Sequence, residues 1–72
     1  MSSIVDAKGL SCPQPVILTM NEIKKTGKGE ITVLVDTVTS RENVSRAAMA
    51  QGWTLKSVEE EGEVFRITIT KD

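Results

Sequence analysis

The stretch from residue 30 to 36 constrains the fold most strongly, because its middle is almost continuously apolar and rich in valine and isoleucine. β-Branched residues favour strands, and a strand with little polar alternation belongs in the interior of a sheet. We therefore expect residues 30 to 36 to form a central strand with a neighbour on each side. The remaining residues must supply those neighbours and a layer that covers them.

Three further segments have the pattern of strands, at residues 3–7, 53–60 and 64–71. In the last of them Phe65, Ile67 and Ile69 alternate with polar residues, which predicts one buried face and one wet face. Glu-Gly-Glu at residues 61–63 predicts a hairpin between the last two strands. The alternation fails between Leu55 and Val58, which indicates a bulge or an edge strand.

A helix is predicted from Pro13 to about residue 26. Proline suits the first helical position, because its missing N–H would have no partner there. Val16, Met20 and Ile23 recur at helical spacing and predict the buried stripe, with Ile17 beside it. Lysines at 24 and 25 and a glycine at 27 are typical of a helix end.

A second helix is predicted after the central strand. Thr39 and Glu42 have the spacing of a capping box, in which each side chain bonds the other residue's backbone N–H. The inward face is predicted to consist of Val44, Ala47 and Ala48, and the helix to end at a glycine at position 52. Trp53 then follows, and we interpret it as a core residue in preference to a recognition aromatic.

The predicted order of elements is βαβαββ, in a single domain spanning residues 1–72. The fold class is α+β: a two-layer α/β sandwich with a mixed four-stranded sheet and two helices on one face. A right-handed crossover makes the first two strands parallel. The loop that carries Cys12 and the loop after Asp36 should therefore lie at the same edge of the sheet, where ligands of such sheets tend to bind.

Composition excludes several function classes. One cysteine and no histidine exclude an internal disulfide and the usual zinc sets, so we expect no metal or cofactor. The formal net charge of −1 and two aromatic residues argue against direct nucleic-acid binding. The lack of histidine and tyrosine argues against a self-contained hydrolase. No signal peptide or membrane-spanning stretch is evident, which predicts a cytoplasmic protein without membrane contact.

Cys12 is the candidate reactive residue, because it immediately precedes Pro13 at the predicted helix start. The unpaired N–H groups and dipole of a helix N-terminus favour a thiolate, so the pKa of Cys12 should fall below that of a free cysteine. Lys8 would act in the same direction if it folds back, whereas Pro13 removes one N–H. With no second cysteine, the chemistry open to the thiol is to accept a group, hold it and pass it on.

Each of these candidate roles has a plainer interpretation. A lone cysteine is often an inert buried residue. Asp36 is either a loop or capping residue or a group that acts near the sulfur. Leu18 lies off the predicted stripe, so it is either an isolated exposed leucine or part of a partner-docking patch beside Cys12.

The motif Asp6-x-x-Gly9-Leu10-x-Cys12-Pro13-x-Pro15, followed by an apolar helix, resembles the TusA/SirA/YedF family of small sulfur carriers. The resemblance extends over essentially the whole chain. It implies that Cys12 carries sulfur as a persulfide, loaded by a cysteine desulfurase or another donor and unloaded by a downstream acceptor protein. In the best-known case the sulfur goes to tRNA thiolation. Whether such a carrier counts as a sulfurtransferase enzyme is left open.

Position by position, the resemblance assigns Cys12 as the persulfide carrier and Pro13 and Pro15 as the prolines that shape the helix start. Asp6, Gly9 and Leu10 match the residues that lead into the motif. Residues 35–44 look closer to the YedF branch than to the Asp-Asp-Pro-rich loop of TusA itself. Some YedF-like proteins are linked to selenium metabolism and carry an additional domain. The other hypotheses are therefore selenium delivery, a non-catalytic regulatory or interaction module, or a fragment of a longer carrier.

Overall fold

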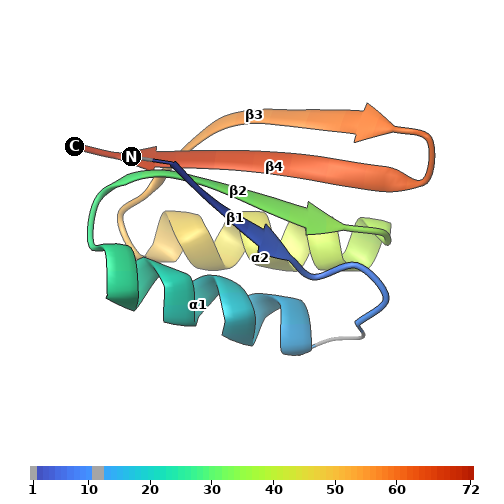
Figure 1. The fold of residues 1–72 in the computed structure, drawn as a ribbon, viewed down its shortest axis with the longest axis horizontal. Helices are drawn as coiled ribbons and strands as arrows, with labels where there is room; N and C mark the ends of the chain where they lie inside the picture. The colour runs from blue at the N-terminus through green and yellow to red at the C-terminus, as the bar shows by residue number, and fades with distance from the viewer. Residues whose placement is uncertain (1, 11–12) are drawn as a thin grey trace.

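The computed structural model describes residues 2–10 and 13–72, so Met1, Ser11 and Cys12 lie outside the described residues. Six elements follow one another in the predicted order βαβαββ. They are β1 (Ser2–Asp6), α1 (Gln14–Thr26), β2 (Gly29–Val35), α2 (Val38–Ala50), β3 (Thr54–Glu61) and β4 (Val64–Lys71). Both helices lie on the same side of the strands, which confirms the predicted two-layer α+β fold (Figure 1).

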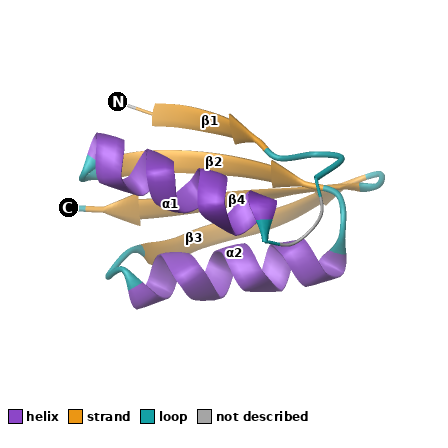
Figure 2. Ribbon diagram, turned by 90° about the horizontal axis from the view of Figure 1, so that it is seen from below, coloured by secondary structure: helices purple, strands orange, loops and turns teal. Residues whose placement is uncertain are grey.

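The four strands form one mixed sheet in the order β1-β2-β4-β3. β1 pairs in parallel with β2, and β4 pairs antiparallel with both β2 and β3. β2 thus has a neighbour on each side, as its apolar middle predicts. Figure 2, seen from the helix side, shows the two helices running side by side in the same direction across one face of the sheet. The β1-α1-β2 crossover therefore brings the end of β1, the start of α1, the end of β2 and the start of α2 to one end of the molecule.

The core lies between the sheet and the helices. Ile31 and Val33 of β2 are fully buried and stand opposite Ile69 and Ile67 of β4. Val44 of α2 is also fully buried against them. On the other face of the sheet the residues of β2 are only half-buried, because no helix covers that face. The apolar run of β2 therefore supplies one core face and one partly exposed face.

Helix α1 begins one residue later than predicted. Pro13 is its N-cap, with backbone angles outside the helical range, and the carbonyl of Pro13 accepts the first helical hydrogen bond from Ile17 N at 3.0 Å. The buried line is also turned relative to the predicted stripe, since Pro15, Thr19 and Ile23 are the buried residues. Thr19 can be buried because its hydroxyl donates to the Pro15 carbonyl oxygen at 2.9 Å.

The remaining apolar side chains of α1 lie beside this buried line. Val16 and Met20 are half-buried against the core. Leu18 also packs against the core, so it is not the isolated exposed leucine that its place off the stripe suggested. Ile17, at 44% exposure, is the more exposed residue.

The predicted cap of α2 at Thr39 is wrong. Thr37 is the N-cap, in an extended conformation, and its Oγ1 accepts from Ser40 N at 3.1 Å. Only Asp36 and Thr37 separate β2 from α2, so Thr39 already lies inside the first turn of the helix. Ser40, Val44 and Ala48 are buried, whereas Ala47, predicted on the inward face, is half-buried.

The last two strands agree closely with the prediction. β3 is an edge strand, and its pairing with β4 shifts register between Leu55 and Ser57, which is the predicted bulge region. Glu61 pairs with Val64, so the hairpin loop consists of Gly62 and the residue after it, and Gly62 has a φ of +63°. Trp53 is 3% exposed and belongs to the core, as predicted. Within residues 2–10 and 13–72, no helix is long and apolar enough to cross a membrane.

Candidate functional site

The site is built on the loop that leaves β1, where three successive backbone N–H groups each have a partner. Ala7 N donates to the Leu34 carbonyl oxygen at 2.8 Å and extends the parallel ladder by one step. Lys8 N donates to Oδ1 of Asp6 at 3.1 Å. Gly9 N donates to Oδ2 of Asp36 at 2.8 Å. These bonds hold the loop at the ends of both parallel strands.

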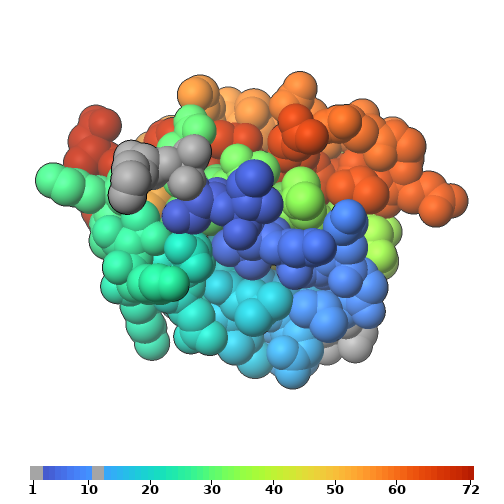
Figure 3. All heavy atoms as spheres, in the orientation of Figure 1, coloured from blue at the N-terminus to red at the C-terminus, as the bar shows by residue number. Residues whose placement is uncertain are grey.

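The chain changes direction at Gly9, which has a φ of +77°. Only glycine adopts this left-handed conformation without a steric penalty. Leu10 then returns to the protein and packs, half-buried, against the core. In Figure 3 the loop after β1 lies on the surface at the right of the molecule, beside the first turn of α1.

Asp36 directly follows β2, and its contact with Gly9 joins residues that lie 27 positions apart in the sequence. This contact confirms that the residues leading to Cys12 and the residue after β2 meet at one edge of the sheet. Cys12 itself lies outside the described residues, between Leu10 and Pro13 in the sequence.

The start of α1 offers few backbone donors. Pro13 and Pro15 have no N–H, so Gln14 and Val16 carry the only N–H groups among the first four positions from the N-cap. No described side chain caps this end of the helix. Unpaired N–H groups and the helix dipole favour negative charge at such a position. The two prolines differ in setting, because Pro13 is exposed while Pro15 is fully buried.

The structure thus brings together most of the predicted site residues. Asp6 ends β1, Lys8, Gly9 and Leu10 lie in the loop after it, Pro13 lies at the start of α1, and Asp36 directly follows β2. Leu18 lies further along α1 and is largely engaged with the core. The sequence reasoning missed Val38, the first residue of α2, which is 53% exposed at the same end of the molecule. The sequence pattern does not mark Val38 as exposed, because its exposure depends on where α2 begins.

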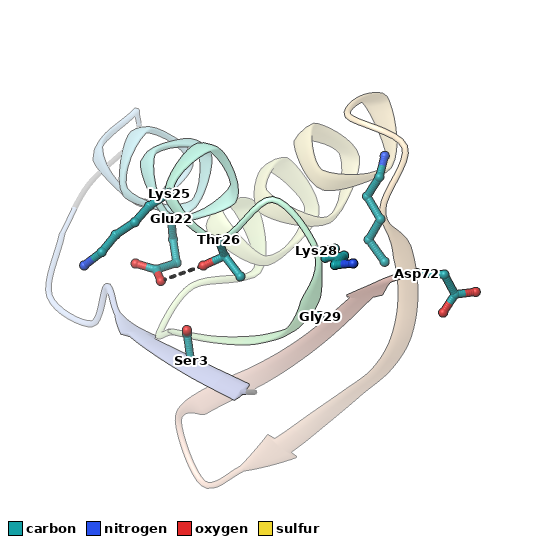
Figure 4. Close-up of a pocket in the computed structure, with 8 residues that line it drawn as sticks. Ser3, Glu22, Lys25, Thr26, Lys28, Gly29 and Asp72 are labelled. Carbon is teal, nitrogen blue, oxygen red and sulfur yellow. Dashed lines mark hydrogen bonds between the residues drawn. The ribbon is translucent and has the colours of Figure 1, made fainter.

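A surface hollow of about 660 Å³ lies at the opposite end of the molecule (Figure 4). It is lined by the starts of β1 and β2, the end of α1 and the end of β4, with Lys25 and Lys28 among its residues. Along the α1 side of this hollow, the Thr26 hydroxyl donates to the Glu22 carboxylate at 3.0 Å. Among the residues that the structure describes, no three His, Cys, Asp or Glu side chains gather in a way that could hold a metal ion.

Comparison with known proteins identifies the family. A family model described as sulfurtransferase TusA matches residues 3–71. The chain belongs to the TusA sulfurtransferase family.

Two relatives of this TusA-family chain agree with the assignment. A protein of Methanocaldococcus jannaschii, named as a candidate sulfur carrier protein, is 35% identical over 68 residues, which is 93% of this chain and 91% of that protein. A SirA-like protein from Desulfitobacterium hafniense has a solved structure with a TM-score of 0.86 and 34% identity, covering 94% of this chain and 95% of that one. The predicted TusA-like fold and the sulfur-carrier assignment are confirmed at the level of the family, whereas the placement in the YedF branch stays a prediction.

Proposed function

We propose that this protein is a sulfur carrier that holds a persulfide sulfur on Cys12 and passes it from a donor, such as a cysteine desulfurase, to an acceptor protein. The observation that carries the proposal is the match to the TusA sulfurtransferase family over residues 3–71. Cys12 is the only cysteine of the chain and therefore the only side chain able to hold a persulfide.

The proposed transfer consists of two exchange steps. The Cys12 thiolate attacks the terminal sulfur of the donor's cysteine persulfide, a new S–S bond forms on Cys12, and the donor's own sulfur leaves as a thiolate. An acceptor thiolate then attacks the terminal sulfur on Cys12, which releases the Cys12 thiolate. One sulfur atom moves in each step, and no external oxidant or reductant is needed.

The setting of the candidate site supports this chemistry. Pro13, the N-cap of the 13-residue helix α1, directly follows Cys12 in the sequence, and the positive end of the helix dipole favours a thiolate over a thiol. Gly9, held by its hydrogen bond to Asp36, and Leu10, packed against the core, precede Cys12 in the sequence. Because the chain has no second cysteine, it cannot form the internal disulfide that would release the sulfur prematurely.

The exposed apolar residues at the same end of the molecule support contact with partner proteins. Ile17, in the first turn of α1, is 44% exposed, and Val38 is 53% exposed. Apolar side chains around a reactive group are suited to a short-lived protein interface. We propose that these two residues contact the donor and the acceptor, with the half-buried Leu18 at the margin of the same surface.

The proposal is tested by incubating the protein with a cysteine desulfurase and free cysteine, followed by mass spectrometry without reductant. We expect one added sulfur atom, located on Cys12 by peptide mapping and removed by dithiothreitol. The matched control is Cys12→Ser, which should remain folded and gain no sulfur. Failure of the wild-type protein to gain sulfur from several desulfurases would refute the carrier function.

The same experiment separates sulfur from selenium delivery. Supplying selenocysteine in competition with cysteine should leave the sulfur adduct predominant if sulfur is the natural cargo. A predominant selenium adduct would favour the selenium carrier. An interaction module without transfer chemistry would instead show no adduct and would retain its partner in a pull-down with Cys12→Ser.

A further inference from the structure

The Asp36 carboxylate forms the last connection between the two parallel strands at the candidate site. The backbone ladder between β1 and β2 ends with the bond from Ala7 N to the Leu34 carbonyl oxygen. Two residues further along each segment, beyond the ends of the strands, Gly9 N donates to Asp36 Oδ2 at 2.8 Å in place of a backbone-to-backbone bond. A hydrogen bond to a carboxylate is about twice as strong as one between neutral groups.

This bond is well placed to control the direction of the chain toward Cys12. Gly9 is the residue that turns the loop, with φ at +77°, and Leu10 packs against the core directly after it. Only Ser11 and Cys12 separate Leu10 from Pro13, the N-cap of α1. The hydrogen bond at Gly9 therefore acts on the chain three positions before Cys12.

Packing does not hold Gly9 in its turned conformation on the side where a Cβ would lie. A Cβ placed on Gly9 would meet nothing within 4 Å, so this side of Gly9 is open to solvent and no neighbouring side chain packs against it. Lys8 N is held by Asp6, but that bond spans only two residues and does not connect the loop to β2. The side chain of Asp36 thus ties Gly9 to the end of β2.

We propose that Asp36 is a positioning residue that holds the loop carrying Cys12 in the orientation required for transfer between proteins. This inference rests on the proposed carrier function and adds to it the residue that orients the thiol. Transfer between two proteins requires the two sulfur atoms to align within a docked complex, and small misplacements of reacting groups have large effects on rate. A small alkylating reagent approaches without docking and does not depend on that alignment.

The test compares Asp36→Ala, Asp36→Asn and the wild-type protein, with Glu59→Ala as a control. Asn retains an oxygen that can accept from Gly9 N but loses the charge, whereas Ala removes the acceptor. Glu59 is an exposed carboxylate on β3, so its removal changes the net charge equally without affecting the loop. All variants are compared under conditions where Trp53 fluorescence shows them to be folded.

For Asp36→Ala we expect hydrogen exchange at the Gly9 amide to accelerate roughly tenfold, which corresponds to the loss of one hydrogen bond. Sulfur loading by the desulfurase should slow roughly tenfold, while the rate of iodoacetamide alkylation of Cys12 should change less than about threefold. Asp36→Asn should recover most of the loading rate, and Glu59→Ala should match the wild-type protein.

The outcomes separate this inference from the carrier function itself. If the wild-type protein gains sulfur and Asp36→Ala gains it at the same rate, the positioning role is overturned and the carrier function stands. Equal losses in loading and alkylation would also overturn it, because they would show a general change at the thiol. If the wild-type protein gains no sulfur, the carrier function and the positioning role fail together, whereas the Gly9 exchange rates still report on the hydrogen bond.

Discussion

The guanidinium of Arg41 lies over the ring of Phe65, with 5.1 Å between its central carbon and the ring centre. Arg41 is in the first turns of α2 and Phe65 is near the start of β4, opposite Val35 at the end of β2. The contact therefore joins the second helix to the sheet at the end of the molecule where the candidate site lies. The Arg41 side chain is 34% exposed, so it also shields the ring from water.

Replacing Arg41 by alanine should lower the free energy of unfolding by about 1 kcal/mol, because a cation over an aromatic face at a partly exposed site contributes about that much. The measurement is denaturant unfolding followed by Trp53 fluorescence. Arg46→Ala is the matched control, since Arg46 is an exposed arginine on the same helix. Equal losses for the two variants would show that the contact with Phe65 adds no stability.

Replacing Thr37 by alanine should destabilise the protein by about 1 kcal/mol, because its hydroxyl oxygen accepts from Ser40 N at the start of α2. Thr39→Ala provides the comparison. Thr39 is an exposed residue within the helix, where alanine has the higher helix propensity, so this change should be neutral or slightly stabilising. Thermal unfolding of both variants distinguishes the observed cap from the one that the capping-box pattern favoured.

Replacing Gly9 by alanine should cost about 1 to 2 kcal/mol of stability, because alanine must adopt a left-handed conformation at this position. No steric clash adds to this cost, since a Cβ would meet nothing within 4 Å. Gly62→Ala is the control: Gly62 has a similar φ of +63° and equally open surroundings in the β3-β4 hairpin. Both variants should lose comparable stability in denaturant unfolding, but only Gly9→Ala should slow sulfur loading.

Comparable slowing in both variants would show that loading depends on overall stability and not on the turn at Gly9. Gly9→Asn offers a further check. Asparagine tolerates the left-handed conformation better than alanine, so this variant should be intermediate in stability and in loading rate.

Much of the fold could be predicted because it depends on periodicity. The alternation of Phe65, Ile67 and Ile69 identified the buried face of β4, and the apolar middle of β2 identified the central strand. The crossover rule then placed the loop after β1 beside Asp36, as the contact with Gly9 shows. These features follow from local patterns combined with a general rule of handedness.

The errors concern choices that local patterns leave undecided. Thr37 and Thr39 are each followed, three positions later, by a polar residue. The glutamate at 42 favoured Thr39 as the N-cap, whereas the N-cap is Thr37. The predicted stripe of α1 did not include Thr19, whose hydroxyl is satisfied within its own helix and can be buried. The hydrogen bond between Gly9 and Asp36 depends on side-chain geometry, which a pattern does not specify. The role of Cys12 stays a prediction.

The two prolines of the motif should respond differently to substitution. The Pro15 side chain is fully buried, so Pro15→Ala removes two core methylene groups and leaves a cavity, at a cost of about 2 to 3 kcal/mol. Pro13 is exposed, and in Pro13→Ala the residue-13 carbonyl still accepts the hydrogen bond from Ile17 N. This change should lower the free energy of unfolding by less than about 1 kcal/mol, because alanine gives the unfolded chain more conformational freedom. Denaturant unfolding monitored at Trp53 measures both. Similar losses in the two variants would show that the burial of the Pro15 side chain adds no stability.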